Sequence, residues 1–159
     1  MVAEVDMATL IVDGLDGVRE LVGRQLGPGE WLPITQARVN AFADATLDHQ
    51  WIHVDVERAE VESPFGGPIA HGYLTLSLLP HLLGQLVDVT GVKATINYGL
   101  NRLRYPSPVR VGSRVRLGVT VAGVEEIRGG LQCQLDCTVE VEGGGKPALI
   151  AEVLFRYYA

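Results

Sequence analysis

The sequence predicts an α+β fold in which one antiparallel β-sheet packs against a single apolar helix. Three observations lead to this prediction. Residues 69–86 are apolar on most sides of a helix, which is typical of a helix buried on most sides. After Gly91 the chain reads as four strands, over residues 93–105, 114–127, 132–142 and 148–157. The Pro- and Gly-rich segments between these strands are too short for the crossovers of parallel strands, so we expect antiparallel hairpins.

The first part of the chain is expected to be mainly helical. The spacing of apolar residues predicts a helix over residues 13–26, which ends at the Gly-Pro-Gly sequence that follows. Thr35 is a candidate N-cap for a second helix that ends near Thr46. The next segments predict, in order, a polar loop, a short helix and a second loop, over residues 48–53, 55–62 and 63–68. Within the apolar helix, Pro80 removes one backbone hydrogen bond and is expected to bend it.

Length and composition favour one globular domain. A chain of 159 residues corresponds to about one domain, so we expect a single domain over residues 1–159, with residues 1–29 as an N-terminal helical extension. Hydrophobic residues at 47% and charged residues at 20% exclude general disorder. The chain has no uninterrupted apolar stretch long enough to span a membrane, so we expect no membrane partner. Glu4 and Asp6 without an early Lys or Arg do not fit a secretory signal, so a cytoplasmic location is expected.

The charge distribution indicates a small anionic ligand. The net charge is −6, which argues against general binding to nucleic acid. Between Val89 and Val124, however, there is no Asp or Glu, and six basic residues occur: Lys93, Arg102, Arg104, Arg110, Arg114 and Arg116. A local cationic strip on an acidic protein suits a compact polyanion better than a long one. Any single arginine of the strip could equally be an ordinary solvated strand residue.

The two cysteines are expected to be buried core residues. Cys133 and Cys137 lie in an alternating segment and point to the same side of a strand. Four strand residues span ~13 Å, which exceeds the distance that a disulfide can bridge. A redox or metal role is therefore not expected.

The residues most able to carry chemistry lie on two nearby segments. Asp48 and His53 are five residues apart in the predicted polar loop, and imidazole exchanges protons near neutral pH while a carboxylate can orient it. His71 and Gly72 begin the apolar helix, where backbone N–H groups lack partners within the helix. A glycine at this place allows a ligand to approach the backbone and an oxyanion to be stabilised there.

These two segments resemble the motifs of the MaoC-like (R)-specific enoyl-CoA hydratases, a family with the hot-dog fold. The family's motif reads Asp-x-Asn-Pro-(Ile/Leu/Val)-His, and a Pro-Ile-(Val/Ala)-His-Gly segment then starts its central helix. Here Asp48, Ile52 and His53 are in register with the first motif, and residues 68–72 read Pro-Ile-Ala-His-Gly. The resemblance covers residues 30–157.

The chain departs from the first motif at two positions. Gln50 stands where the family usually has Asn, and Trp51 where it usually has Pro. Gln keeps the amide but is longer by one methylene group, while Trp removes the fixed backbone angle of proline. A Gln-Trp sequence resembles that of a bacterial single-domain subgroup, so the resemblance still implies activity.

The resemblance implies a hydratase with a defined site. Asp48 and His53 would hold a water, activate it for attack on C3 of a trans-2-enoyl-CoA and return a proton to C2, which gives an (R)-3-hydroxyacyl-CoA. The Gly72 N–H would stabilise the thioester oxygen. Five further residues would contact substrate, with the arginines near the phosphates of coenzyme A: His71, Gln50, Asn101, Arg102 and Arg104. No metal or cofactor is implied, because nothing is oxidised, and family members usually form homodimers through their sheet edges.

Other functions compete with this interpretation. Within the same fold the protein could be an acyl-CoA thioesterase, or a dehydratase of 3-hydroxyacyl groups on an acyl carrier protein. It could also be a module that binds acyl thioesters without turnover. A further alternative is an iron site, since Asp48, His53 and His71 offer a carboxylate and two imidazoles.

Overall fold

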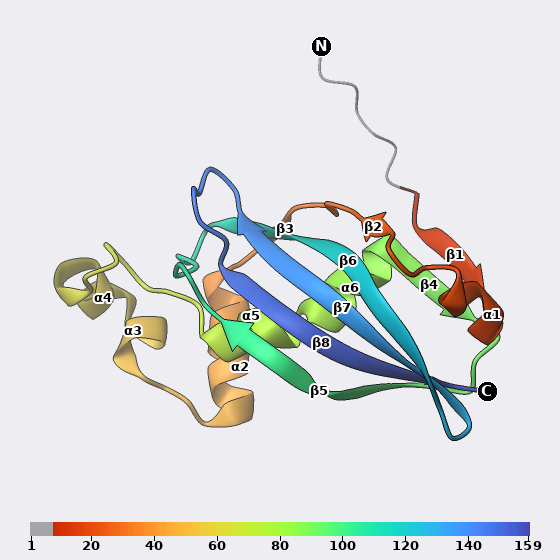
Figure 1. The fold of residues 1–159 in the computed structure, drawn as a ribbon. Helices are drawn as coiled ribbons and strands as arrows, with labels where there is room; N and C mark the ends of the chain where they lie inside the picture. Colours follow the sequence, from red (N-terminus) through yellow and green to blue (C-terminus); the bar gives the residue numbers. More distant parts are fainter. Residues whose placement is uncertain (1–7) are drawn as a thin grey trace, which may run out of the picture.

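A curved antiparallel sheet dominates the computed structural model, which describes residues 8–159 (Figure 1). The main order of its strands is β2-β6-β7-β8-β5, and β3 pairs with β6 beyond the end of β2. All strand pairs of this sheet are antiparallel. The strands are β2 (Gln25–Leu26), β3 (Leu32–Pro33), β5 (Ala94–Arg104), β6 (Arg114–Ile127), β7 (Gly130–Val141) and β8 (Leu149–Tyr158). The α+β prediction and the ranges of the four long strands are confirmed.

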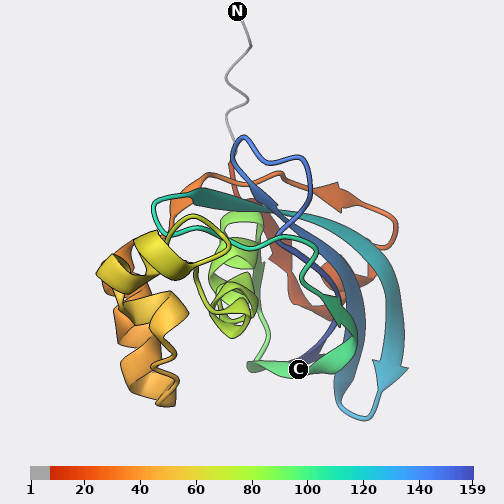
Figure 2. The ribbon, with the colours of Figure 1, turned by 90° about the vertical axis from the view of Figure 1, so that its left-hand side faces the viewer.

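The apolar helix lies in the hollow of this sheet, as predicted (Figure 2). It consists of α5 (Gly72–Ser77) and α6 (Leu79–Leu86), which are separated only by Leu78. Leu78 keeps right-handed helical angles, so the backbone stays close to helical between the two segments. Because Pro80 has no N–H to donate to the carbonyl of Leu76, one bond of the ladder is missing where the two segments meet. Leucines of the helix form the centre of the core: Leu74, Leu79, Leu82, Leu83 and Leu86.

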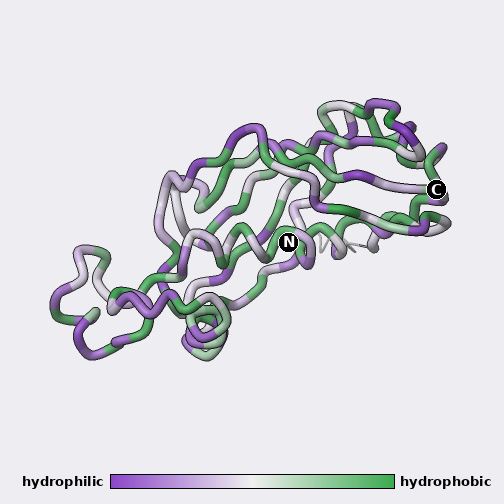
Figure 3. Tube along the Cα trace, turned by 90° about the horizontal axis from the view of Figure 1, so that it is seen from below, coloured by the Kyte–Doolittle hydropathy of each residue, from purple (hydrophilic) through white to green (hydrophobic). Residues whose placement is uncertain are grey.

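The sheet strands alternate between core and solvent, and Figure 3 shows hydrophobic and hydrophilic residues alternating along them. Cys133 and Cys137 of β7 are 1% and 3% exposed, so both are core residues as predicted. The hairpins β6–β7 and β7–β8 are also confirmed. The prediction of a hairpin between β5 and β6 was wrong. β5 pairs with β8, so residues 105–113 cross from one side of the sheet to the other.

The helix predicted near the N-terminus is much shorter in the structure than expected. In place of one helix over residues 13–26, the chain forms β1 (Leu10–Asp13), the short helix α1 (Gly14–Arg19) and then β2. β1 pairs in parallel with β4 (Val87–Thr90), which follows α6 directly. The helix stops because Gly23 takes a left-handed φ of 82° and its N–H donates to Val121, which draws the chain onto β6. Residues 1–7 of the expected N-terminal extension lie outside the described residues.

Three helices lie on the side of α5 that faces away from the sheet (Figure 2): α2 (Gln36–Thr46), α3 (Trp51–Val54) and α4 (Val56–Glu62). Thr35 is the N-cap of α2, as predicted, and its hydroxyl accepts a hydrogen bond from the Arg38 N–H at 3.2 Å. The segment expected to be a polar loop is a loop only up to Gln50, since α3 makes one helical turn after it. None of the helices over residues 8–159 is long and apolar enough to cross a membrane.

Candidate active site

His53 is held in a defined tautomer at the end of α3. Its side chain is 6% exposed, and its Nδ1 lies 2.6 Å from the backbone oxygen of Ile69. A carbonyl oxygen only accepts, so Nδ1 carries the proton and Nε2 keeps a free electron pair. The backbone oxygen of His53 in turn accepts a hydrogen bond of 2.8 Å from the side-chain amide of Gln36. The imidazole is therefore oriented as a base, with Nε2 available for a proton.

The surroundings of His53 keep its imidazole neutral. Burial is the largest effect and lowers the pKa of His53 below its ordinary value of 6.5. The hydrogen bond with Ile69 raises the pKa, the neighbouring His71 lowers it, and the Asp48 carboxylate raises it. Since the net shift is downward, the ring is unprotonated at neutral pH. It can then accept a proton in a reaction.

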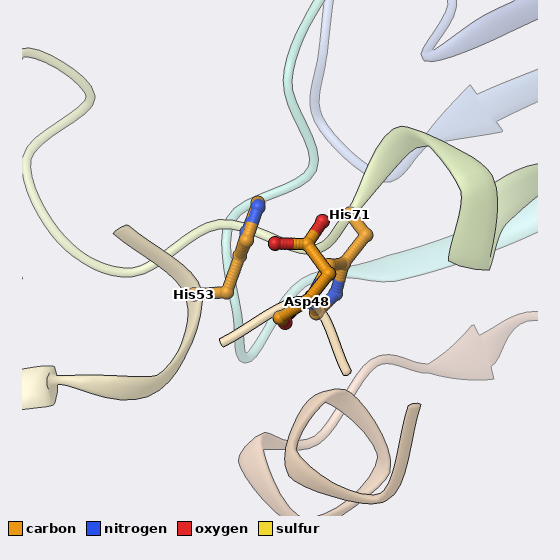
Figure 4. Close-up of side chains that lie close together, drawn as sticks. All are labelled: Asp48, His53 and His71. Carbon is orange, nitrogen blue, oxygen red and sulfur yellow. The ribbon is translucent and has the colours of Figure 1, made fainter. Parts of the chain in front are cut away.

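Asp48 reaches this imidazole from the loop after α2. That helix ends at Leu47, which takes a left-handed φ of 63°, and the chain then turns toward α3. Within the turn, the Gln50 N–H approaches the Asp48 carboxylate at 3.4 Å. Side-chain atoms of Asp48, His53 and His71 all lie within 4.8 Å of one another, and Figure 4 shows the three side chains converging from separate segments. The structure therefore brings together the carboxylate and the imidazole singled out in the sequence.

Gly72 begins α5 beside this group, and Tyr105 covers it. A Cβ atom at position 72 would lie only 3.0–3.2 Å from the Tyr105 ring, so the ring rests directly on the glycine. A cavity of about 310 Å³ adjoins Gly72, with Phe65, Thr75 and Ala148 also in its wall. The start of the helix thus borders a largely apolar space in which a ligand can meet the backbone.

Three contacts of the site were missed in the sequence. They are the packing of Tyr105 against Gly72, the hydrogen bond between His53 and the Ile69 oxygen, and the hydrogen bond from the Gln36 side-chain amide to the His53 backbone oxygen. Each joins residues that are distant along the chain. None of them belongs to a local pattern of residue types. Only the aromatic residue at the end of a predicted strand, followed by Pro106, offered a signal that this position has a special role.

The structure separates the predicted coenzyme A contacts from this group. Arg102 and Arg104 pair with Glu152 and Ile150 on the sheet face that points away from the apolar helix. Asn101 lies in a bulge between Leu100 and Arg102, and all three predicted contacts are exposed. Over residues 8–159 these residues make no hydrogen bond or ion pair with Asp48 or His53, and their role in binding stays a prediction. Gln50 adjoins the group, and it is its backbone N–H that approaches the Asp48 carboxylate.

The same three side chains were the candidate metal ligands, and their geometry does not favour that role. The rings of His53 and His71 are stacked, with centroids 3.8 Å apart and planes tilted by 25°. A metal ion lies close to the plane of each imidazole that binds it, at ~2.1 Å from the nitrogen. Two nearly parallel rings cannot both meet one ion in this way.

Comparison with known proteins identifies the family. A family model described as a MaoC like domain matches residues 18–142. The chain belongs to the MaoC-like dehydratase family. It is 56% identical over 138 residues to the 3-hydroxyacyl-thioester dehydratase Z of Mycobacterium tuberculosis, covering 86% of this chain and 91% of that protein. It is 47% identical over 140 residues to the Nodulation protein N of Rhizobium leguminosarum bv. viciae, covering 86% of each.

A similar solved structure supports the assignment of the fold. The (R)-hydratase from A. caviae involved in PHA biosynthesis superposes with a TM-score of 0.68 at 30% identity, covering 84% of this chain and 94% of that one. The MaoC-like chain therefore has the hot-dog fold, in which the sheet wraps the central helix formed by α5 and α6. As a member of this dehydratase family, the protein is a hydro-lyase, which confirms that it is an enzyme.

Proposed function

We propose that this MaoC-like protein interconverts trans-2-enoyl-CoA and (R)-3-hydroxyacyl-CoA by adding or removing water. The observation that carries the proposal is the convergence of the Asp48 carboxylate and His53, whose Nε2 is unprotonated, with His71, the residue before Gly72 at the start of α5. A hydration needs a base for water, an acceptor for the second water hydrogen and a donor for the thioester oxygen. His53, Asp48 and Gly72 can supply these in that order.

The reaction follows from the protonation states in the site. A water between Asp48 and His53 gives a proton to Nε2 of His53 while its oxygen bonds to C3 of the enoyl group. The C2–C3 double bond becomes a single bond, and negative charge moves to the thioester oxygen, where the Gly72 N–H stabilises it. A proton from the site then returns to C2. The hydroxyl ends on C3 and the other hydrogen on C2, so no electrons are exchanged and no redox cofactor is needed. Dehydration is the same sequence reversed.

Two features support a thioester substrate. The cavity beside Gly72 is lined mainly by apolar groups, which suits an acyl chain better than a sugar or a phosphate. The relative with 56% identity is named for 3-hydroxyacyl thioesters. Coenzyme A is proposed as the carrier because its phosphates match the basic strip in the sequence, and an acyl carrier protein is the alternative carrier.

The test is a turnover assay with crotonyl-CoA and purified protein. We expect loss of the absorbance of the conjugated thioester without release of free thiol. In the reverse direction, (R)-3-hydroxybutyryl-CoA is expected to react and the (S) isomer to remain. Release of thiol while the double bond persists would show a thioesterase. Activity confined to acyl groups on a carrier protein would overturn the choice of coenzyme A.

Substitutions then connect the activity to the site. Asp48→Asn and His53→Ala are each expected to lower kcat by at least ~10²-fold, the usual range for removing acid–base help. His49→Ala is the matched control, because this neighbouring imidazole is exposed and pairs with Asp44 at 2.8 Å instead of joining the site. Wild-type activity in either of the first two variants would contradict the proposal, as would stabilisation by substrate without any turnover.

The sheet edge supports the expected homodimer. Among residues 8–159, β5 has a partner strand on one side only, and three of its apolar side chains are 41–53% exposed: Ile96, Tyr98 and Leu100. An edge strand of this kind is protected when a second copy covers it. We propose that two chains associate along β5. Light scattering is expected to give twice the chain mass of 17.2 kDa, and the mass of one chain would contradict the dimer.

A further inference from the structure

His71 is the most enclosed of the three converging side chains. It is 3% exposed, its ring is stacked on His53 with centroids 3.8 Å apart, and Phe42 packs against it at 4.9 Å. Its Nε2 lies 2.9 Å from the backbone oxygen of Asp48, across 23 residues of sequence. We infer that His71 is a positioning residue, whose Nε2–H fixes the Asp48 loop against the start of α5 and whose ring supports His53. This inference rests on the proposed function and names the residue that assembles its site.

One hydrogen bond and burial together leave His71 no exposed nitrogen for a substrate. Because the Asp48 oxygen can only accept, Nε2 carries the proton and Nδ1 has the free electron pair. That Nδ1 is buried and has no hydrogen-bond partner among the residues that the structure describes. His71 was expected from the sequence to bind substrate directly. The geometry points instead to an action through Asp48 and His53.

The Asp48 loop needs such an anchor. Asp48 is exposed, and in the described part of the chain its carboxylate accepts one hydrogen bond, the long one from the Gln50 N–H within the same turn. That bond shapes the turn but does not place it relative to His53. The bond from His71 ties the loop to the helix whose first residue is Gly72. A displacement of about 1 Å in a catalytic group can cost ~10² in rate, so losing this bond is expected to lower kcat.

Two amide substitutions separate positioning from simple filling of space. His71→Gln carries an NH₂ group at nearly the reach of Nε2 and can donate to the Asp48 oxygen. His71→Asn has the same chemistry but reaches only as far as Nδ1, so it cannot. Both remove the imidazole ring and both place an amide in the same buried space. They therefore differ mainly in the one hydrogen bond that the inference concerns.

The expected result is a difference in kcat with little change in KM. With crotonyl-CoA, His71→Gln is expected to keep at least about one tenth of wild-type kcat, and His71→Asn to fall by ~10²-fold, with KM changed less than threefold in both. Equal kcat in the two variants, or a change confined to KM, would overturn the inference. The first outcome would mean that the bond is irrelevant, and the second that His71 binds substrate.

A measurement without substrate keeps this test distinct from that of the proposed function. Amide hydrogen exchange over residues 47–50 is expected to be faster in His71→Asn than in wild type, and close to wild type in His71→Gln. Unchanged exchange in His71→Asn would overturn the anchoring role. If the wild-type protein does not turn over crotonyl-CoA, the proposed function fails, whereas the exchange result still decides whether His71 holds the loop.

Discussion

Gly72→Ala tests the contact between the helix start and Tyr105 quantitatively. The new Cβ would lie 3.0 Å from Cζ and 3.1 and 3.2 Å from the two Cε atoms of the ring. Carbon atoms prefer separations of ~3.5–4.0 Å, so the ring must retreat by about 0.5 Å. Tyr105 is 39% exposed and can move outward, which places the cost near the low end of the ~1–3 kcal/mol typical of overpacking.

The same substitution has a small compensating gain. Alanine is favoured over glycine in a helix by up to about 1 kcal/mol, and less at a helix end. The free energy of unfolding is therefore expected to change by less than about 1 kcal/mol, or ~2–4 °C in Tm for a chain of this size. Turnover should respond far more strongly. The methyl group and the displaced ring occupy the space where a thioester oxygen would reach the Gly72 N–H, and loss of such a donor costs ~10²–10³ in kcat.

The assay combines thermal melting with crotonyl-CoA turnover, and the chain supplies a matched control. Gly84 lies in α6 on an exposed position, and a Cβ there would meet no atom within 4 Å. Gly84→Ala is expected to raise Tm slightly and to leave turnover unchanged. If Gly72→Ala keeps kcat within threefold of wild type while folded, the reasoning about Gly72 is refuted.

Three further predictions concern the cap, the thiols and the pH dependence. Thr35→Ala removes the N-cap bond of α2 and is expected to lower the free energy of unfolding by ~1 kcal/mol in thermal or denaturant melts, whereas Thr35→Ser retains it; equal melts for the two variants would argue against the cap. Burial raises the pKa of Cys133 to about 11 and that of Cys137 to about 12, so neither thiol should react with a disulfide reagent at pH 8 until denaturant is added; labelling of the native protein would contradict their burial. Burial lowers the pKa of His53 in the folded state below 6.5, so the unfolded chain binds more protons in that range. The free energy of unfolding should then fall as the pH drops below about 6.5, and His53→Gln should flatten that fall; an equally steep fall in the variant would exclude His53 as its source.

Local patterns predicted the parts of the fold that depend on local physics. In β7, residues of alternate polarity face opposite sides of the sheet because a strand has a period of two, and both cysteines were placed correctly. The apolar helix was predicted because most of its sides are apolar and are stabilised by burial. The convergence of Asp48 and His53 followed from their closeness in sequence to each other and to the helix start.

The errors have a common cause, which is pairing between distant segments. β1 consists of four residues whose partner, β4, lies 77 positions later, and the alternation of apolar and polar residues in β4 covers only four positions. Apolar residues after β1 are spaced as in a helix. That helix ends early because the backbone at Gly23 and Leu26 pairs with β6 instead. The placement of β5 beside β8 likewise depends on the whole sheet. Sequence spacing alone carries no information on which edge a strand will join.

The departure from the family motif at positions 50 and 51 is explained by the start of α3. Gln50 has backbone angles of −55° and 135°, the extended conformation that a residue before proline also adopts. Trp51 is the first residue of α3, a position where the N–H has no partner within the helix and where proline is therefore well tolerated. The start of α3 thus gives the backbone of Gln50 and Trp51 the conformation that a proline at position 51 would favour. The Trp51 ring adds a contact that proline lacks, since the Arg58 guanidinium of α4 lies 4.3 Å from its centroid. The backbone between Asp48 and His53 can therefore hold the geometry expected of the motif although two of its residues differ.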